Sequence, residues 1–180
     1  MVYVILAKGF EETEAVTVID VLRRSGVETA SVGIGGKNVT GSHGITICAD
    51  CDDSTAVLDS KLEMIYLPGG MPGMLNLDSS EFVEKAIRYC QDNDLYISAM
   101  CASPSVLGHK GVLKGKKACC YPGFEKEMLG AEVSYDDVTV DGKIITSRGP
   151  ATAMNLAVKL SEIMAGTEKS SKVSEGLLCR

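Results

Sequence analysis

The sequence contains no tryptophan, only three phenylalanines and only two histidines. It has no apolar run close to the ~20 residues that a membrane-spanning helix needs. Its first apolar run, residues 2–7, is too short for a secretory signal and ends at Lys8. The formal net charge is −6, and lysine and arginine form no cluster. Because nucleic-acid-binding proteins usually carry a basic patch, the composition argues against a stable nucleic-acid partner.

Cysteine is the residue type that stands out by its number. The chain has 180 residues, too many to depend on disulfides for a core, and an odd count of seven cysteines. These features predict a reducing, cytoplasmic compartment in which most thiols are free. The seven residues are Cys48, Cys51, Cys90, Cys101, Cys119, Cys120 and Cys179.

The apolar pattern predicts one α/β domain over residues 1–180. No repeat, low-complexity segment or linker interrupts it, and 45% hydrophobic with 23% charged residues is typical of a globular chain. Short β-rich runs alternate with helical ones. Strands are predicted at 2–6, 28–34, 39–40, 45–47, 64–67, 95–100, 117–120, 133–135, 138–140 and 144–147. Helices are predicted at 13–25, 80–92, 102–107, 151–165 and 168–176.

This alternation is typical of a doubly wound, mainly parallel sheet with helices on both faces. In such sheets ligands bind outside the carboxyl ends of the strands. Three segments that follow strands should therefore converge there: residues 8–14, residues 68–73 and Cys101.

Cys101 lies between a short strand and a helix that has Pro104 at an early position. This layout resembles the nucleophile elbow of hydrolases. The partial positive charge of the helix N–H groups favours a thiolate, so we expect a pKa well below the ordinary thiol value. The alternative is a small buried residue that closes the strand.

Glu11, Glu12 and Glu14 open the first predicted helix, where acids compensate the helix dipole. One of them can instead turn inward beside Cys101, stay protonated and donate a hydrogen bond to the thiolate. Gly69 and Gly70 follow a strand and either form a simple turn or, with the N–H of Ala102, hold an oxyanion. Their loop lacks the lysine of a phosphate loop and the dinucleotide fingerprint.

Four ordered segments resemble one known family: AKGFEETEAV after the first strand, LPGG after a central strand, AMCASP at the turn and TSRGPATA before a late helix. They are similar to the ThiJ/PfpI superfamily, in the branch called DJ-one, over nearly the whole chain. The resemblance implies a flavodoxin-like fold of the class I glutamine amidotransferase-like type and a homodimer. By motif position it implies that Cys101 is the nucleophile, Glu14 the partner carboxyl, Gly70 and Ala102 the oxyanion donors, and Arg148 a neighbour of the site.

The resemblance further implies an enzyme of glyoxalase or deglycase type that acts on reactive dicarbonyls without cofactor or metal, in protection against oxidative stress. The alternative is a redox sensor or chaperone that uses oxidation of Cys101. Two departures bear on this choice. Ala102 stands where proteolytic members carry histidine, and Tyr121, before Pro122, stands where several close relatives carry histidine.

The remaining candidates give weaker signals. Cys48 and Cys51 have the C-x-x-C spacing, but one such pair without a nearby histidine is a poor zinc motif, and a dimer surface is an alternative setting for it. Cys119 and Cys120 are expected to alternate faces on a strand, so at most one of them packs inward. His109 is expected to be a surface residue.

Overall fold

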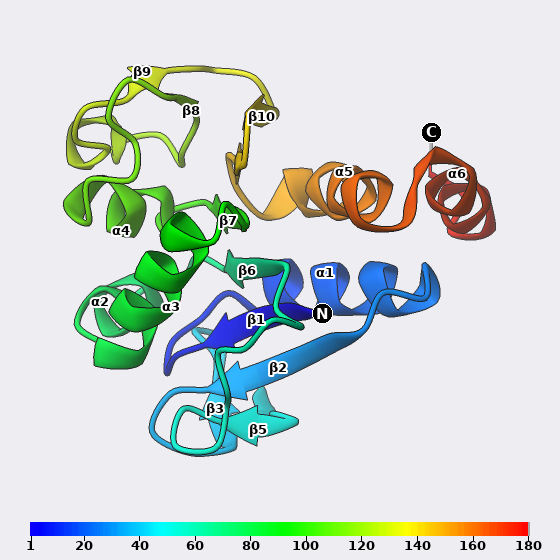
Figure 1. Cartoon of the computed structure of the whole chain (residues 1–180), viewed down its shortest axis with the longest axis horizontal. Helices are drawn as coiled ribbons and strands as arrows, with labels where there is room; N and C mark the ends of the chain where they lie inside the picture. Colours follow the sequence, from blue (N-terminus) through cyan, green and yellow to red (C-terminus); the bar gives the residue numbers. More distant parts are fainter. Residues whose placement is uncertain (180) are drawn as a thin grey trace.

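The fold is built on a seven-stranded sheet (Figure 1). The structure is a computed structural model that describes residues 1–179. The sheet consists of β1 (Val2–Leu6), β2 (Thr29–Gly33), β5 (Cys51–Asp52), β6 (Met64–Leu67), β7 (Tyr96–Met100), β10 (Val138–Asp141) and β11 (Ile144–Ser147). Their order is β10-β11-β7-β6-β1-β2-β5, and all neighbouring pairs are parallel except β10 with β11.

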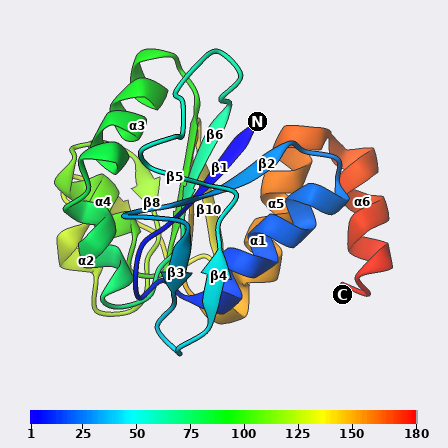
Figure 2. The ribbon, with the colours of Figure 1, turned by 90° about the horizontal axis from the view of Figure 1, so that it is seen from below.

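Helices cover both faces of this sheet (Figure 2). On one face lie α2 (Gly73–Asp78), α3 (Glu81–Asp92) and α4 (Pro104–His109). On the other face lie α1 (Glu12–Arg24) and α5 (Ala153–Ala165), which pack against each other. The helix α6 (Thr167–Gly176) packs on α5 outside these layers. The predicted doubly wound, flavodoxin-like architecture is confirmed.

The central strands are buried on both faces, which explains why they read as continuous apolar runs. In β1, Tyr3 and Ile5 pack into the core under α2–α4, whereas Val4 and Leu6 pack into the core under α1 and α5. This strict alternation lets one short strand serve two cores. None of the helices within residues 1–179 has the length and apolar character required to cross a membrane.

Two small two-stranded sheets flank the main one. The hairpin of β3 (Asn38–Thr40) and β4 (Thr46–Cys48) is antiparallel. The second sheet pairs β8 (Lys117–Ala118) with β9 (Glu132–Val133) in parallel, and η1 (Glu125–Glu127) lies in the segment between them. The strand predicted over 117–120 is therefore shorter than expected and lies outside the main sheet. β5, α2 and η1 were not predicted from the sequence.

Candidate active site

Adjacent strands β7, β6 and β1 end at one edge of the sheet, and the loops that follow them meet there. The N–H of Glu11, after β1, donates to the carbonyl oxygen of Gly69, after β6, over 2.8 Å. A Cβ atom built on Gly69 would lie 2.5 Å from the Cβ of Cys101, after β7. The predicted convergence of the three segments is confirmed.

Cys101 occupies a sharp turn between β7 and α4. Its φ is +60°, a left-handed conformation that is uncommon for a residue with a side chain. Two hydrogen bonds fix this turn: its N–H donates to Ser147 over 2.9 Å, and its carbonyl oxygen accepts from the N–H of Tyr121 over 2.8 Å. The side chain is half-buried at the edge of the sheet. Strain held by surrounding contacts is typical of functional positions.

Glu14 projects from the first turn of α1 into the interior, where it is wholly buried. Its Oε2 accepts the N–H of Gly69 over 2.7 Å. Its Oε1 has no N–H or O–H partner among residues 1–179, while the Cys101 thiol lies beside the carboxyl as a donor. Burial raises the pKa of Glu14 to about 7, against the lowering by the Gly69 N–H and the thiol. A buried carboxyl with an unpaired oxygen favours its protonated form.

The thiol and the carboxyl act on each other. Burial and the charge of Glu14 raise the pKa of Cys101 to about 12, whereas the N–H groups of Gly70 and Ala102 lower it. The sequence-based expectation of a thiol pKa well below the ordinary value is therefore wrong. It counted the N–H groups at the sulfur but neither burial, which is the largest effect, nor the neighbouring charge of Glu14. The two groups titrate as one unit, and protonation of Glu14 removes the repulsion.

The loop after β6 has no room for a side chain at Gly69 or Gly70. A Cβ at Gly69 would meet Cys101 and Glu14, and a Cβ at Gly70 would lie 2.4 Å from the backbone nitrogen of Glu11. Gly70 also has a φ of +95°, which side chains rarely adopt. Because Gly69 and Gly70 have no side chains, the loop lies close to the sulfur of Cys101. The N–H groups of Gly70 and Ala102 can then receive a developing oxyanion beside that sulfur.

Tyr121 and Arg148 border the site through the backbone. Tyr121 is 46% exposed, and its ring lies against Gly149, where an added Cβ would be 3.1 Å from ring carbon Cδ2. Arg148 directly follows Ser147, the acceptor of the Cys101 N–H. Its positive charge lowers the pKa of Cys120, but burial outweighs it and raises that pKa to about 12.

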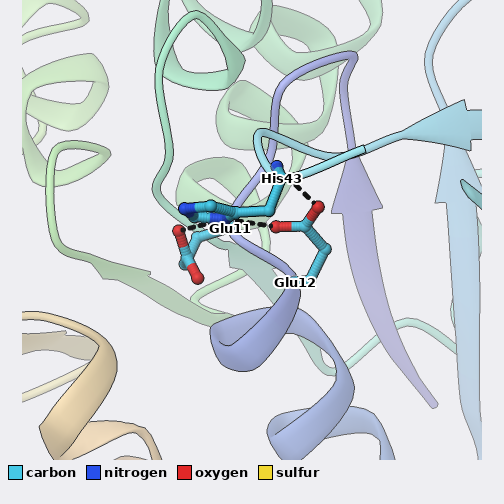
Figure 3. Close-up of side chains that lie close together, drawn as sticks. All are labelled: Glu11, Glu12 and His43. Atoms are coloured by element: carbon cyan, nitrogen blue, oxygen red, sulfur yellow. Dashed lines mark hydrogen bonds and ion pairs between the residues drawn. The ribbon is translucent and has the colours of Figure 1, made fainter. Parts of the chain in front are cut away.

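A second charged group lies at the start of α1 (Figure 3). Glu12 accepts the N–H groups of His43, over 2.8 Å, and Ile45, over 3.3 Å. The Nδ1 of His43 lies 3.0 Å from Oε2 of Glu12 and 3.6 Å from Oε2 of Glu11. Burial raises the pKa of Glu12, but the hydrogen bonds with His43 and Ile45 outweigh it and lower the pKa to about 2. The carboxylate therefore anchors the β3–β4 hairpin to α1.

Within residues 1–179, one group of side chains has the composition to hold a metal ion. It consists of Glu11, Glu12 and His43, whose possible ligand atoms lie within 4.8 Å of one another. The carboxylates raise the pKa of His43, first through its hydrogen bond with Glu12, so the imidazole itself can balance the acids as a cation. No metal was predicted from the sequence, in which Glu11 and Glu12 are explained by the helix dipole. Their pairing with His43 could not be predicted, because it depends on how the hairpin folds back.

Residues 1–163 match the DJ-1/PfpI family. The chain belongs to this family. It is 39% identical over 178 residues to the Drosophila melanogaster protein dj-1beta, with 97% of this chain and 95% of that protein covered. It is 30% identical over 171 residues to the Caenorhabditis elegans glutathione-independent glyoxalase DJR-1.2, with coverages of 93% and 89%. The predicted family resemblance is confirmed.

Solved structures of family members share the fold. The crystal structure of Drosophila melanogaster DJ-1beta superposes with a TM-score of 0.93 at 36% identity, over 99% of this chain and 97% of that chain. The Toxoplasma gondii DJ-1 structure, which is oxidized, gives a TM-score of 0.93 at 36% identity, over 98% and 97%. The DJ-1/PfpI fold thus extends over the described chain.

The other cysteines divide by burial. Cys119 and Cys120 are both buried, so the prediction that only one packs inward is wrong. They lie beyond the short β8, where the N–H of Cys119 donates to the Thr146 hydroxyl over 2.9 Å and Cys120 joins the core under α2–α4. Cys48 is exposed and Cys51 is half-buried, and both are free.

His109 is exposed, as predicted. Its ring lies between Asp78, 2.8 Å away, and Glu127, 3.1 Å away, and these hydrogen bonds raise its pKa. The residue links α4 to α2 and η1 at the surface.

Proposed function

We propose that this protein is a cysteine-dependent enzyme that acts on reactive dicarbonyls such as methylglyoxal, or on their early adducts, in the manner of a glyoxalase or deglycase. The observation that carries the proposal is the buried Glu14 carboxyl, with one unpaired oxygen, beside the Cys101 thiol. The relation to a C. elegans protein named as a glutathione-independent glyoxalase supports it.

The chemistry begins with addition of the Cys101 thiolate to the aldehyde carbon. The carbonyl oxygen takes the negative charge between the N–H groups of Gly70 and Ala102, and a proton then gives the hemithioacetal. Glu14 in its ionised form removes the proton from the former aldehyde carbon and returns it to the neighbouring carbon, while the hydroxyl proton passes from the oxygen of the first carbon to the oxygen of the second. The product is a thioester, which water hydrolyses to lactate and the free thiol without net oxidation.

A dual role for Glu14 follows from its raised pKa. A carboxyl with a pKa of about 7 has comparable protonated and ionised populations at neutral pH. It can therefore donate a proton to one intermediate and accept one from the next. Proton transfer by a positioned group typically contributes about 10²–10⁴-fold in rate.

The proposal includes a small aldehyde or dicarbonyl substrate, no cofactor and no metal. It also includes a homodimer and action in the cytoplasm, where a reducing environment keeps the cysteines free. Tyr121 and Arg148 are assigned to the border of the substrate site.

The test is lactate formation from methylglyoxal in the absence of glutathione. Wild type should form lactate, and Cys101→Ser should reduce the rate to the uncatalysed level. A folded Cys101→Ser variant that retains the wild-type rate would contradict the proposal. Cys48→Ser, which changes an exposed thiol, is the matched control and should leave the rate unchanged.

A second candidate is a redox sensor or chaperone that uses the same thiol without turnover. The observation in its favour is Tyr121, because a phenol is a poorer general base at neutral pH than the imidazole that several relatives carry there. Peroxide would then convert Cys101 to sulfenic and sulfinic acid. Oxidation of Cys101 together with absent lactate formation favours this candidate.

A further inference from the structure

Ser103 is buried between the Cys101 turn and the β6 loop. The residue has no exposed surface, and its hydroxyl donates to the carbonyl oxygen of Pro68 over 2.6 Å. Pro68 is also buried. It directly precedes Gly69 and Gly70, so this hydrogen bond joins the segment after β7 to the loop after β6.

The position of Ser103 would ordinarily suggest a helix cap. It immediately precedes α4, and a serine at such a position usually accepts a hydrogen bond from a helix N–H group. Here the side chain makes no capping hydrogen bond, and the backbone is already helical, with φ −72° and ψ −17°. The hydroxyl is directed away from its own helix and toward the loop.

The loop is also fixed at Gly69, the residue that follows Pro68. The N–H of Gly69 donates to Glu14, and the carbonyl oxygen of Gly69 accepts from Glu11. These contacts tie the loop to α1. Ser103 is the contact that ties it to the segment carrying Cys101, and so sets where the Gly70 N–H lies relative to the sulfur.

We propose that Ser103 is a positioning residue that aligns the Gly70 N–H group with the sulfur of Cys101. A hydrogen bond weakens steeply when its angle closes, so a small shift of the loop changes the stabilisation of a sulfur anion. The inference deepens the proposed function, because the same N–H group would receive the oxyanion of the substrate.

Ser105 provides a matched control. It lies two residues further along, on the same segment, and is equally buried. Its hydroxyl has no hydrogen-bond partner among residues 1–179. Ser103→Ala and Ser105→Ala therefore remove the same atom from two nearby positions of one segment, but only the first breaks a contact with the β6 loop.

The experiment measures the rate of Cys101 alkylation by iodoacetamide as a function of pH. Ser103→Ala should move the midpoint of the profile upward by about half a pH unit or more, which corresponds to an about threefold slower reaction below the midpoint. Ser105→Ala should keep the wild-type profile. Ser103→Thr, which keeps the hydroxyl, should restore it, and thermal melting should verify that each variant is folded.

Equal profiles for Ser103→Ala and wild type, or equal shifts for Ser103→Ala and Ser105→Ala, would overturn the inference. If the added methyl group unfolds Ser103→Thr, the comparison of the two alanine variants still decides. Alkylation needs no dicarbonyl substrate, so a protein that forms no lactate can still show the Ser103 effect. Conversely, lactate formation with an unchanged Ser103→Ala profile would leave the proposed function standing and remove this inference alone.

Discussion

At the scale of single residues, the chemistry depends on where one proton resides. Glu14 is wholly buried with an unpaired oxygen, and Cys101 is half-buried beside it with two N–H groups directed at its sulfur. Two adjacent anions repel in such surroundings, so the pair keeps one proton over the neutral pH range. A protonated Glu14 that donates to the thiolate satisfies both groups.

Two substitutions at Glu14 separate charge from hydrogen bonding. Glu14→Gln keeps a donor and removes the charge, whereas Glu14→Leu removes both. We expect a lower thiol pKa in Glu14→Gln than in Glu14→Leu, because only glutamine can donate to the sulfur anion. Thiolate absorbance followed over pH measures this. Equal values in both variants would show that the donor has no influence.

The Glu14 carboxyl also makes folding stability depend on pH. The pKa of Glu14 is raised from 4.5 to about 7. The stability that the protein has with a protonated Glu14 is therefore fully present below about pH 4.5 and is lost as the pH rises through 7. The free energy of unfolding of Glu14→Gln relative to wild type should therefore increase between pH 5 and pH 8, by an amount on the order of 3 kcal/mol. Urea denaturation at the two pH values measures the difference. A difference that stays constant with pH would mean that the carboxyl ionises as it does in water.

Tyr121 is the residue that we expect to limit proton transfer. We expect slow lactate formation in wild type and a gain of up to about 10²-fold in Tyr121→His, because an imidazole is a better base at neutral pH. Tyr121→Phe serves as the control for the loss of the hydroxyl. Fast wild-type turnover that Tyr121→His leaves unchanged would indicate that Glu14 alone suffices.

At the scale of secondary-structure elements, the β3–β4 hairpin depends on one carboxylate. Glu12 binds the hairpin through the N–H groups of His43 and Ile45. Hydrogen bonds to a charged group contribute about 1.5–3 kcal/mol. We expect Glu12→Gln to lower the free energy of unfolding by about 1–2 kcal/mol at pH 6.

The sign of the pH effect at Glu12 is opposite to that at Glu14. The pKa of Glu12 is lowered from 4.5 to about 2. The stabilisation by the ionised Glu12 carboxylate is therefore present above about pH 4.5 and is lost as the pH falls toward 2. The gap between wild type and Glu12→Gln should therefore narrow from pH 5 to pH 3 in denaturant titrations. Glu81→Gln, which changes an exposed carboxylate, is the control and should show little effect at either pH.

The elements differ in how well the sequence predicts them. Strands β1 and β6 agree with their predicted ends, and α3 agrees to within one residue, because apolar periodicity and a serine cap are local signals. The two-residue β5 and the six-residue α2 were missed, since so short a segment carries no periodicity and depends on its neighbours. The site shows the same limit. The three segments each follow a strand, and this position predicts that they converge. The sequence pattern does not distinguish Glu14 from Glu11 and Glu12, so only the family resemblance identified Glu14 as the partner carboxyl.

At the scale of the whole molecule, we propose a contact surface from two exposed apolar side chains. Val16 on α1 is 48% exposed and Ile45 on the hairpin is 59% exposed. Val16 lies one helical turn from Glu12, and Glu12 accepts the N–H of Ile45. The side chains of Val16 and Ile45 therefore belong to adjoining parts of one surface. Two-fold dimers are the commonest oligomers, and this surface is our candidate for the dimer contact.

Sedimentation at micromolar concentration tests the assembly. The chain mass is 19.1 kDa, and wild type should sediment with twice that mass. Ile45→Glu should yield the monomer, because it buries an unpaired charge in the contact. Val140→Glu, on the edge strand β10 and similarly exposed, should remain dimeric. A wild-type protein that sediments only as a 19.1 kDa species would refute the dimer.

The most direct measurement of the central claim, that Cys101 is the reactive group, is competitive alkylation of the seven cysteines. Limiting iodoacetamide at pH 7, followed by mass spectrometry of the peptides, reports which thiol reacts first. We predict that Cys101 is labelled before Cys48, although Cys48 is the more exposed, because only Cys101 has a carboxyl donor and two N–H groups at its sulfur. Labelling of Cys48 with Cys101 untouched would contradict the account.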